Sequence, residues 1–287
     1  MSDAGTLSSA FVAAAGALRQ AGMETPELDA RLLLCHAAKV THEGFIARGR
    51  EKLDPEAGAR LERALARRLK REPMSRITGT REFYGREFLL GPETLDPRAD
   101  TETLIEAALA HVSARGGRNR SLTILDLGTG TGCILITLLA ELPNARGLGT
   151  DISQSALALA AHNAARLGVA DRACFLAADW LDAIEGGFDL IVANPPYLAA
   201  EEIERLAPEV AVYDPPGALC GGADGLEAYR RIAGRVHRVL APDGRLFVEI
   251  GPTQAQEVTE IFRTIGLEVG ALGRDLAGRP RVVVAGR

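Results

Sequence analysis

The sequence of 287 residues is poor in cysteine, and this scarcity argues against the sites that paired cysteines build. The four cysteines are scattered and form no Cys-x-x-Cys pair, so neither a disulfide framework nor a metal site is expected. Three of them fall in apolar stretches, where we expect buried free thiols.

Long apolar runs and aromatic residues are also scarce. No apolar run approaches the roughly 20 residues that a membrane-spanning helix needs, so we expect no membrane span. Residues 10–18 are apolar, but no basic segment precedes them, and we interpret them as an amphipathic helix rather than a signal peptide. Aromatic residues make up 5% of the chain and include one tryptophan, Trp180. With 47% hydrophobic residues, the composition is typical of a cytoplasmic enzyme of one or two domains.

The chain has no overall excess of positive charge, since its formal net charge is −5. Residues 47–88 are an exception, with 12 basic and 7 acidic side chains. This stretch either grips an acidic protein partner or forms a solvated helix face, and the sequence leaves both interpretations open. Because nucleic-acid binding depends on broad basic patches, we expect no direct nucleic-acid partner.

A strand followed by a glycine-rich loop indicates a nucleotide-binding site. Residues 122–127 have the pattern of a strand and residues 133–142 that of a helix. The Gly-x-Gly-x-Gly spacing between them differs from the Gly-x-Gly-x-x-Gly of NAD enzymes, and Asp126 stands just before the loop. Glycines let the backbone approach a ligand closely. The loop residues expected to contact a cofactor are Gly128, Thr129, Gly130, Thr131 and Gly132.

Two further carboxylates follow later strands. Asp151 lies 21 residues after Gly130, where a carboxylate accepts both hydroxyls of a ribose; its alternative role is to cap the helix that begins near Ser155. Asp179 follows an apolar strand and can accept from an adenine amino group. The indole of Trp180 can flank an adenine ring, and packing in the core is its alternative role.

The most informative segment is Asn194-Pro195-Pro196-Tyr197, directly after the buried strand 188–193. In open α/β sheets, ligands bind where strands end. The two prolines stiffen the loop, so the Asn194 amide and the carbonyl groups of Asn194 and Pro195 become fixed acceptors for both hydrogens of an NH2 group. Tyr197 offers a flat face for stacking. The segment therefore predicts a site for an adenine, a cytosine or a carboxamide.

These features follow successive strands in an order that resembles the S-adenosylmethionine-dependent methyltransferases. The Asn-Pro-Pro-Tyr sequence narrows the resemblance to enzymes that methylate a planar amino group on nitrogen. From about residue 70 to its C-terminus, the chain closely resembles one family, the release-factor glutamine methyltransferases (the HemK or PrmC family). The motifs that carry this resemblance are 79–85, 97–102, 126–132, 179–180, 194–197, 208–210, 218–226, 249–254 and 275–279.

The resemblance implies an α/β fold, namely a Rossmann-like class I methyltransferase domain with a seven-stranded, mostly parallel sheet. Family members transfer a methyl group from S-adenosyl-L-methionine to the amide nitrogen (N5) of the glutamine in the Gly-Gly-Gln tripeptide of class I peptide chain release factors. The implied product of the cofactor is S-adenosyl-L-homocysteine. The implied catalytic residues are Asn194, Pro195 and Tyr197, with Pro196 also in the substrate site and Asn194 also near the cofactor.

The expected chemistry depends on position rather than on a general base. Acceptors at Asn194 Oδ1 and the Pro195 carbonyl would aim the amide lone pair at the methyl group and stabilise positive charge developing on nitrogen. The proton can leave after transfer, when the nitrogen is cationic. Glu249, near the end of another predicted strand, either assists or makes a structural hydrogen bond.

Three regions are expected along the chain. Residues 1–73 should form a helical substrate-recognition domain with three helices, residues 74–97 a β-hairpin linker, and residues 98–287 the methyltransferase domain. We expect the protein to be a monomer.

The segment before the methyltransferase domain departs from the family pattern. Leu95, Asp96 and Ala99 replace the residues usual in the family, and we expect them to alter the lip of the pocket while leaving the cofactor and acceptor motifs intact. A helix should begin in the same segment, with Asp100 or Thr101 as its cap.

Other activities stay open at this point. A ribosomal-protein glutamine methyltransferase would use the same chemistry. A DNA adenine-N6 methyltransferase must flip its base and needs a basic cleft, and this acidic chain has no spare domain for target recognition. A cofactor-binding regulator with a vestigial site is the non-enzymatic alternative, which the intact segment 194–197 does not support.

Overall fold

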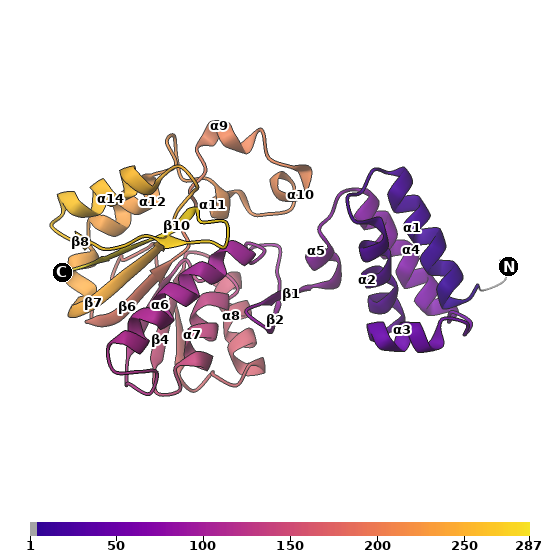
Figure 1. Cartoon of the computed structure of the whole chain (residues 1–287), viewed down its shortest axis with the longest axis horizontal. Helices are drawn as coiled ribbons and strands as arrows, with labels where there is room; N and C mark the ends of the chain where they lie inside the picture. The colour runs from indigo at the N-terminus through magenta and orange to yellow at the C-terminus, as the bar shows by residue number, and fades with distance from the viewer. Residues whose placement is uncertain (1–4) are drawn as a thin grey trace. The chain divides into compact units, whose positions relative to one another are not determined.

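The computed structural model describes residues 5–287, and Figure 1 shows the course of the chain. The chain divides into two compact units, of which one ends at Gly79 and the other begins at Thr80. The first four residues of the expected helical domain lie outside the described residues. None of the described helices combines the length and the apolar character that crossing a bilayer requires.

Within the described residues, the smaller unit consists of five helices around a core of alanine and leucine side chains. Thr6, Thr41 and Asp54 each begin a helix, because their side-chain oxygens accept a backbone N–H of the first turn. The helices are α1 (Leu7–Gln20), α2 (Pro26–Ala38), α3 (His42–Arg48), α4 (Pro55–Leu69) and α5 (Met74–Thr78).

Helix α5 extends this unit beyond residue 73, where the sequence had placed its end. Ile77 of α5 is buried in the core that α1, α2 and α4 share, and Gly79 ends the helix in a left-handed conformation (φ 76°). Helices α3 and α5 were not expected, because seven and five residues are too few for a periodic pattern to show.

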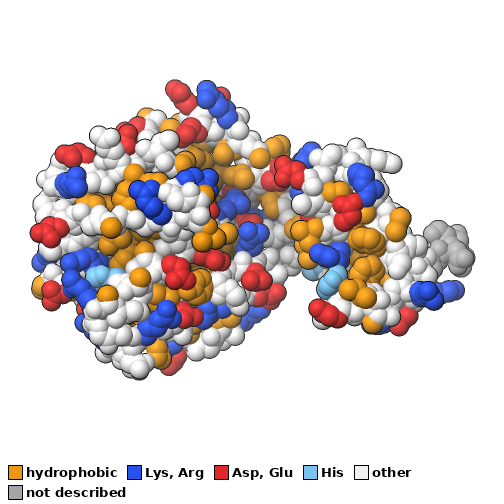
Figure 2. Space-filling view, viewed as in Figure 1, with side chains coloured by type: hydrophobic (Ala, Val, Ile, Leu, Met, Phe, Trp, Pro, Cys, Tyr) orange, Lys and Arg blue, Asp and Glu red, His pale blue; other side chains and the backbone are white. Residues whose placement is uncertain are grey.

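The smaller unit also leaves large hydrophobic side chains exposed, and Figure 2 shows hydrophobic side chains among charged ones on its visible face. Scattered exposed hydrophobic residues are usual on a protein surface, and five of the large ones lie in this unit. They are Val12, Leu28, Leu32, Ile46 and Leu69.

A β-hairpin opens the larger unit. Strands β1 (Thr80–Phe83) and β2 (Arg86–Leu89) pair antiparallel, and Tyr84 and Gly85 connect them with positive φ angles of 51° and 69°, as a two-residue turn requires. The structure places the hairpin within the larger unit because Phe83 and Phe88 are buried in that unit's core, with ring centroids 6.2 Å apart.

The larger unit is built on one twisted sheet with the strand order β5-β4-β3-β6-β7-β10-β8, and the two-residue strand β9 pairs with β10. Strands β3 to β7 are parallel and β10 is antiparallel to β7. The predicted Rossmann-like class I fold is therefore confirmed, with β9 added to the seven expected strands. The strands are β3 (Thr123–Leu127), β4 (Arg146–Asp151), β5 (Ala173–Ala177), β6 (Phe188–Ala193), β7 (Leu240–Glu249), β8 (Glu268–Val269), β9 (Gly273–Arg274) and β10 (Pro280–Gly286).

Helices cover both faces of this sheet (Figure 1), so alternate strand residues enter two separate cores. Ile124 joins the core under α6, α7 and α8, whereas Leu125 and Leu127 join the core under α12, α13 and α14. The remaining elements are η1 (Ala99–Thr101), α6 (Glu102–Ala114), α7 (Cys133–Glu141), α8 (Gln154–Arg166), α9 (Ala200–Ile203), α10 (Pro208–Ala211), α11 (Pro216–Leu219), α12 (Glu227–Ala233), α13 (Val236–Val239) and α14 (Ala255–Thr264).

The expectation of three buried thiols is wrong. Cys133 is buried at the start of α7, but Cys35 and Cys220 are only partly buried and Cys174 is exposed. Cys174 lies on β5, which is the edge strand of the sheet, so it lacks a neighbouring strand on one side.

Asn163 of α8 joins the hairpin to the glycine loop. Its Oδ1 accepts from Leu89 N (2.9 Å), and its Nδ2 donates to the Leu89 carbonyl (3.1 Å) and the Thr131 carbonyl (3.0 Å). The side chain is fully buried, so no water replaces these bonds if it is removed. One amide therefore positions both the hairpin and the loop.

Replacing Asn163 with Ala should lower the free energy of unfolding by about 2–4 kcal/mol, because it leaves buried backbone groups without partners and opens a small cavity. Urea unfolding of the full chain measures this loss. His162→Ala is the matched control, since His162 is exposed on the same helix, and it should change the stability by less than about 0.5 kcal/mol. Equal losses in the two variants would contradict the role of Asn163.

Candidate active site

The carboxyl ends of four parallel strands form one line at the edge of the sheet. Leu127 of β3 pairs with Thr150 of β4 and with Ala193 of β6, and Ala193 pairs with Val248 of β7. The next residue along each strand therefore reaches the same edge. These residues are Gly128, Asp151, Asn194 and Glu249, each of which the sequence had singled out.

The glycine loop follows β3 in a conformation that other residues rarely adopt. Gly128, Gly130 and Gly132 have φ angles of 69°, 53° and 81°. At Gly132 a Cβ would also come within 2.7 Å of Ile136 Cδ1. Thr129 N donates to the Thr150 carbonyl (2.8 Å), which fixes the loop on β4. The loop thus exposes backbone to the adjoining cavity.

Asp151 holds this loop from the neighbouring strand. Its Oδ2 accepts from Gly130 N (2.9 Å), and its Oδ1 accepts from Ser153 N (2.9 Å). The alternative role as a helix cap is wrong, because Ser153 caps α8 by accepting from Ala156 N. Each carboxylate oxygen keeps a lone pair for a ligand hydroxyl.

Asp126 lies beneath the loop and does not reach the cavity. It is fully buried, and Thr129 Oγ1 donates to its Oδ2 at 2.6 Å. Among the described residues its Oδ1 has no hydrogen-bond partner. Burial raises the pKa of Asp126 to about 7, against the lowering effect of the Thr129 hydrogen bond.

Asp179 and Trp180 stand on the other side of the cavity. Asp179 Oδ2 pairs with Arg231 Nη2 at 2.6 Å, so the carboxylate is held in place while still lining the cavity. Trp180 has a positive φ of 56° and lines the cavity while it packs against the core under α12. The packing role of this indole is therefore confirmed, and its contact with an adenine ring stays a prediction.

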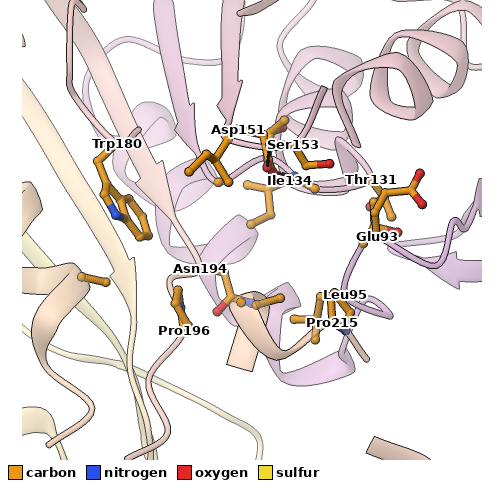
Figure 3. A pocket seen from close by; sticks show the side chains of 18 of the residues that line it. Glu93, Leu95, Thr131, Ile134, Asp151, Ser153, Trp180, Asn194, Pro196 and Pro215 are labelled. Atoms are coloured by element: carbon orange, nitrogen blue, oxygen red, sulfur yellow. Dashed lines mark hydrogen bonds between the residues drawn. The ribbon is translucent and has the colours of Figure 1, made fainter. Parts of the chain in front are cut away.

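One cavity of about 580 Å³ is lined by Asp151, Asp179, Trp180, Asn194 and four residues of the glycine loop, Gly128, Thr129, Gly130 and Thr131. Gly132, which the sequence also predicted at the cofactor, is not among its lining residues. In the view of Figure 3, Trp180 and Asp151 lie at one end, whereas Asn194, Pro196 and Pro215 lie at the other. A cavity of this size suits a small-molecule cofactor.

A second cavity of about 460 Å³ lies behind Asn194, and this residue lines both. Of the rest of the tetrapeptide, Pro196 lines only the first cavity, whereas Pro195 and Tyr197 line only the second. Asn194 Nδ2 donates to Thr101 Oγ1 (3.1 Å), which leaves Oδ1 as the side-chain acceptor. Asn194-Pro195-Pro196-Tyr197 is thus part of the wall between two chambers.

Hydrogen bonds fix the end of this tetrapeptide. Gln254 Nε2 donates to the carbonyl groups of Tyr197 (2.8 Å) and Gly225 (3.2 Å), while its Oε1 accepts from Gly251 N (3.0 Å). Gly225 has no room for a side chain, since a Cβ there would lie 2.4 Å from the Tyr197 carbonyl oxygen. Burial raises the pKa of Tyr197, so its phenol stays neutral.

Glu249 lies in the wall of the second cavity and is almost fully buried. Burial raises its pKa to about 7, while the hydrogen bond of the Thr101 hydroxyl and the charge of Arg281 oppose this effect. Within the described chain, its Oε2 has no hydrogen-bond partner. Glu249 is therefore a carboxyl group beside the second chamber rather than in the first.

The sequence missed Thr101 as a site residue and proposed it only as a helix cap. Its side chain makes no capping hydrogen bond and instead accepts from Asn194. Of the departures from the family pattern, Leu95 lines both cavities and Ala99 lines the second. Asp96 is buried within 3.6 Å of Arg81. The sequence feature that could have indicated Thr101 as a site residue is the 97–102 motif, in which it lies.

Comparison with known proteins identifies the family. The PrmC N-terminal domain matches residues 9–79, and a methyltransferase domain matches residues 118–263. The release factor glutamine methyltransferase of Cereibacter sphaeroides is 48% identical over 276 residues, covering 96% of each chain. That of Rhodospirillum rubrum is 47% identical over 270 residues, covering 94% of this chain and 82% of its own. The chain belongs to the release factor glutamine methyltransferase family.

Solved structures agree with the methyltransferase fold of this family. A methyltransferase from Pyrococcus furiosus matches 71% of this chain and 89% of its own, with a TM-score of 0.51 at 15% identity. The catalytic domain of hMettl16 matches 81% and 82%, with a TM-score of 0.55 at 18% identity. At such identities the likeness concerns the fold alone. The suspected release factor glutamine methyltransferase family is confirmed by the sequence relatives.

The raised pKa of Asp126 predicts a pH-dependent cost to stability. The folded pKa, about 7, exceeds the unfolded value of about 3.9, so protons stabilise the fold and this contribution is lost as the pH rises from about 4 to 7. Asp126→Asn should remove this dependence. The difference in unfolding free energy, Asp126→Asn minus native chain, should therefore increase by about 3 kcal/mol between pH 4.5 and pH 8.

Urea unfolding of both proteins at the two pH values measures this difference. Glu249 is present in both proteins, so its own titration cancels in the comparison. A difference in stability that stays constant between pH 4.5 and pH 8 would show that Asp126 is already ionised in the folded protein.

Proposed function

We propose that this protein transfers a methyl group from S-adenosyl-L-methionine to the side-chain amide nitrogen of the glutamine in the Gly-Gly-Gln motif of class I peptide chain release factors. The observation that carries the proposal is the position of Asn194, whose side chain lies in the wall between two cavities. A direct transfer between two molecules requires two adjoining sites and, beside the line of transfer, a group that orients the acceptor.

The first cavity fits the cofactor. Gly128 and Gly130 leave room for close backbone approach, Asp151 offers acceptors for ribose hydroxyls, and Trp180 offers an aromatic face for adenine. The Asp179 carboxylate, which Arg231 holds in place, would accept a hydrogen bond from the adenine amino group. When bound, the cofactor supplies a methyl group that its sulfonium already activates.

The second cavity fits the target side chain. Its walls include apolar groups of Leu95, Leu198 and Val210, which shield an uncharged carboxamide from water. Tyr197 adds a flat face for the amide plane. Glycines beside the target glutamine would let it enter such a chamber without side-chain clashes.

Asn194 and Pro195 would provide the catalysis. Asn194 Oδ1 and the Pro195 carbonyl would accept the two hydrogens of the amide NH2 and direct its lone pair toward the first cavity. The same two oxygens would stabilise the positive charge that develops on nitrogen, and this is stabilisation of the transition state rather than of the bound substrate. The excess proton leaves after transfer.

The helical unit would recognise the partner protein. Its exposed hydrophobic side chains, among them Val12, Leu32 and Ile46, provide contact area, and the excess of basic residues in 47–88 favours an acidic partner. We further propose that the protein acts as a cytoplasmic monomer, since one chain supplies the lining of both cavities.

Mass spectrometry of acceptors incubated with labelled S-adenosyl-L-methionine tests the proposal. The acceptors are a class I release factor, the same factor with its Gly-Gly-Gln glutamine replaced, a ribosomal fraction and duplex DNA. We expect a methyl group on that glutamine alone. Label on a ribosomal protein or on DNA would keep the site chemistry and reject the substrate.

Asn194→Ala should lower kcat by at least about 100-fold, because it removes one of the two acceptors that orient the amide. Its affinity for S-adenosyl-L-methionine, measured by calorimetry, should stay within about tenfold, since Asn194 only borders that cavity. Should cofactor affinity fall as far as kcat, Asn194 would belong to the cofactor site instead.

A further inference from the structure

The orientation of the Asn194 amide is as important as its position. Its two ends differ, since Oδ1 accepts hydrogen bonds and Nδ2 donates them. Only Oδ1 suits the NH2 group of a carboxamide, because a donor facing a donor leaves both without a partner. Something must therefore determine which end faces the cavities.

Thr101 lies at the position that decides this. Its side chain is 2% exposed, so water does not compete for its hydroxyl. The oxygen accepts from Asn194 Nδ2 at 3.1 Å. Thr101 thus holds the donor end of the side chain that borders both cavities.

The direction of this bond decides which end of the amide remains for the substrate. Asn194 donates through Nδ2 and Thr101 Oγ1 accepts, so Oδ1 is the end left for the cavities. In the flipped amide, Nδ2 would face the NH2 group of a carboxamide, and two donors that meet in a buried site are both left without an acceptor, which is unfavourable.

The segment that carries Thr101 is itself fixed on both sides. Asp100 pairs with Arg281 of β10 at 2.5 Å, and Glu102 Oε1 accepts from Tyr84 N at 2.9 Å. The short η1 turn is thereby anchored to the sheet and to the hairpin. The Thr101 hydroxyl is held in place before a substrate arrives.

We propose that Thr101 is a positioning residue for methyl transfer: its buried hydroxyl holds the Asn194 amide with Oδ1 toward the acceptor chamber. This inference rests on the proposed function and deepens it, because it assigns the residue that sets the polarity of the acceptor site. Thr101 also lines the first cavity, and the role assigned to it is exerted through Asn194 rather than by contact with a reacting atom.

Two substitutions separate the hydroxyl from the packing of the side chain. Thr101→Val keeps the shape and removes the hydroxyl, whereas Thr101→Ser keeps the hydroxyl and removes a methyl group. Thr137→Val is the matched control, because Thr137 is a fully buried threonine of α7 whose hydroxyl has no hydrogen-bond partner among the described residues and which lines neither cavity.

With a release factor as acceptor, Thr101→Val should lower kcat roughly 10- to 100-fold, by analogy with the loss of one oriented hydrogen bond at other active sites. The KM for the release factor and the affinity for S-adenosyl-L-methionine should stay within about threefold. Thr101→Ser and Thr137→Val should keep kcat within about threefold. An unchanged kcat in Thr101→Val, or an equal loss in Thr101→Ser, would overturn the proposal.

A second measurement does not depend on the substrate. In protein labelled with ¹⁵N-asparagine, the side-chain NH2 signal of Asn194, identified by its absence in Asn194→Asp, should exchange with water slowly in the native chain and in Thr101→Ser. Exchange should be at least about tenfold faster in Thr101→Val. Equal exchange in all three would reject the proposed hydrogen bond even if the native enzyme methylated no release factor, an outcome that would reject the proposed function separately.

Discussion

The parallel pairing of β3 with β4 on one side and β6 on the other is the constraint on which the rest of the structure depends. Parallel strands in register end together, so three stretches of sequence that are far apart deliver Gly128, Asp151 and Asn194 to one edge. Helices on both faces bury the strands and make this register costly to shift, since a one-residue slip would exchange the two cores. The positions of these three residues along the edge are therefore set by the register of the sheet.

Hydrogen bonds and prolines also fix the two loops that follow these strands. The glycine loop is tied to β4 through Asp151 and to the hairpin through Asn163. The tetrapeptide on the other side is fixed by two prolines and by Gln254. Buried polar groups make these ties, and each is directional, so they set angles as well as distances. Chemistry that depends on aiming a lone pair requires such control.

Local sequence patterns predicted the sheet, the glycine loop, Asp151 and the tetrapeptide, because each has a signature within a few adjacent residues. They could not predict Thr101 or Asn163, whose partners lie 93 and 74 residues away, since only the folded topology brings these residues together. Thr101 even had a plausible local role as a helix cap, which the structure does not use. Short helices such as α5 were missed because their burial comes from neighbouring helices rather than from their own period.

The wall between the two cavities has a consequence for the kinetic scheme. Because Asn194 borders both chambers, the two chambers adjoin at this side chain. If they hold the two reactants as proposed, the methyl group passes directly from one reactant to the other within a ternary complex. No residue then has to carry the group after the first product has left, as a ping-pong cycle would require.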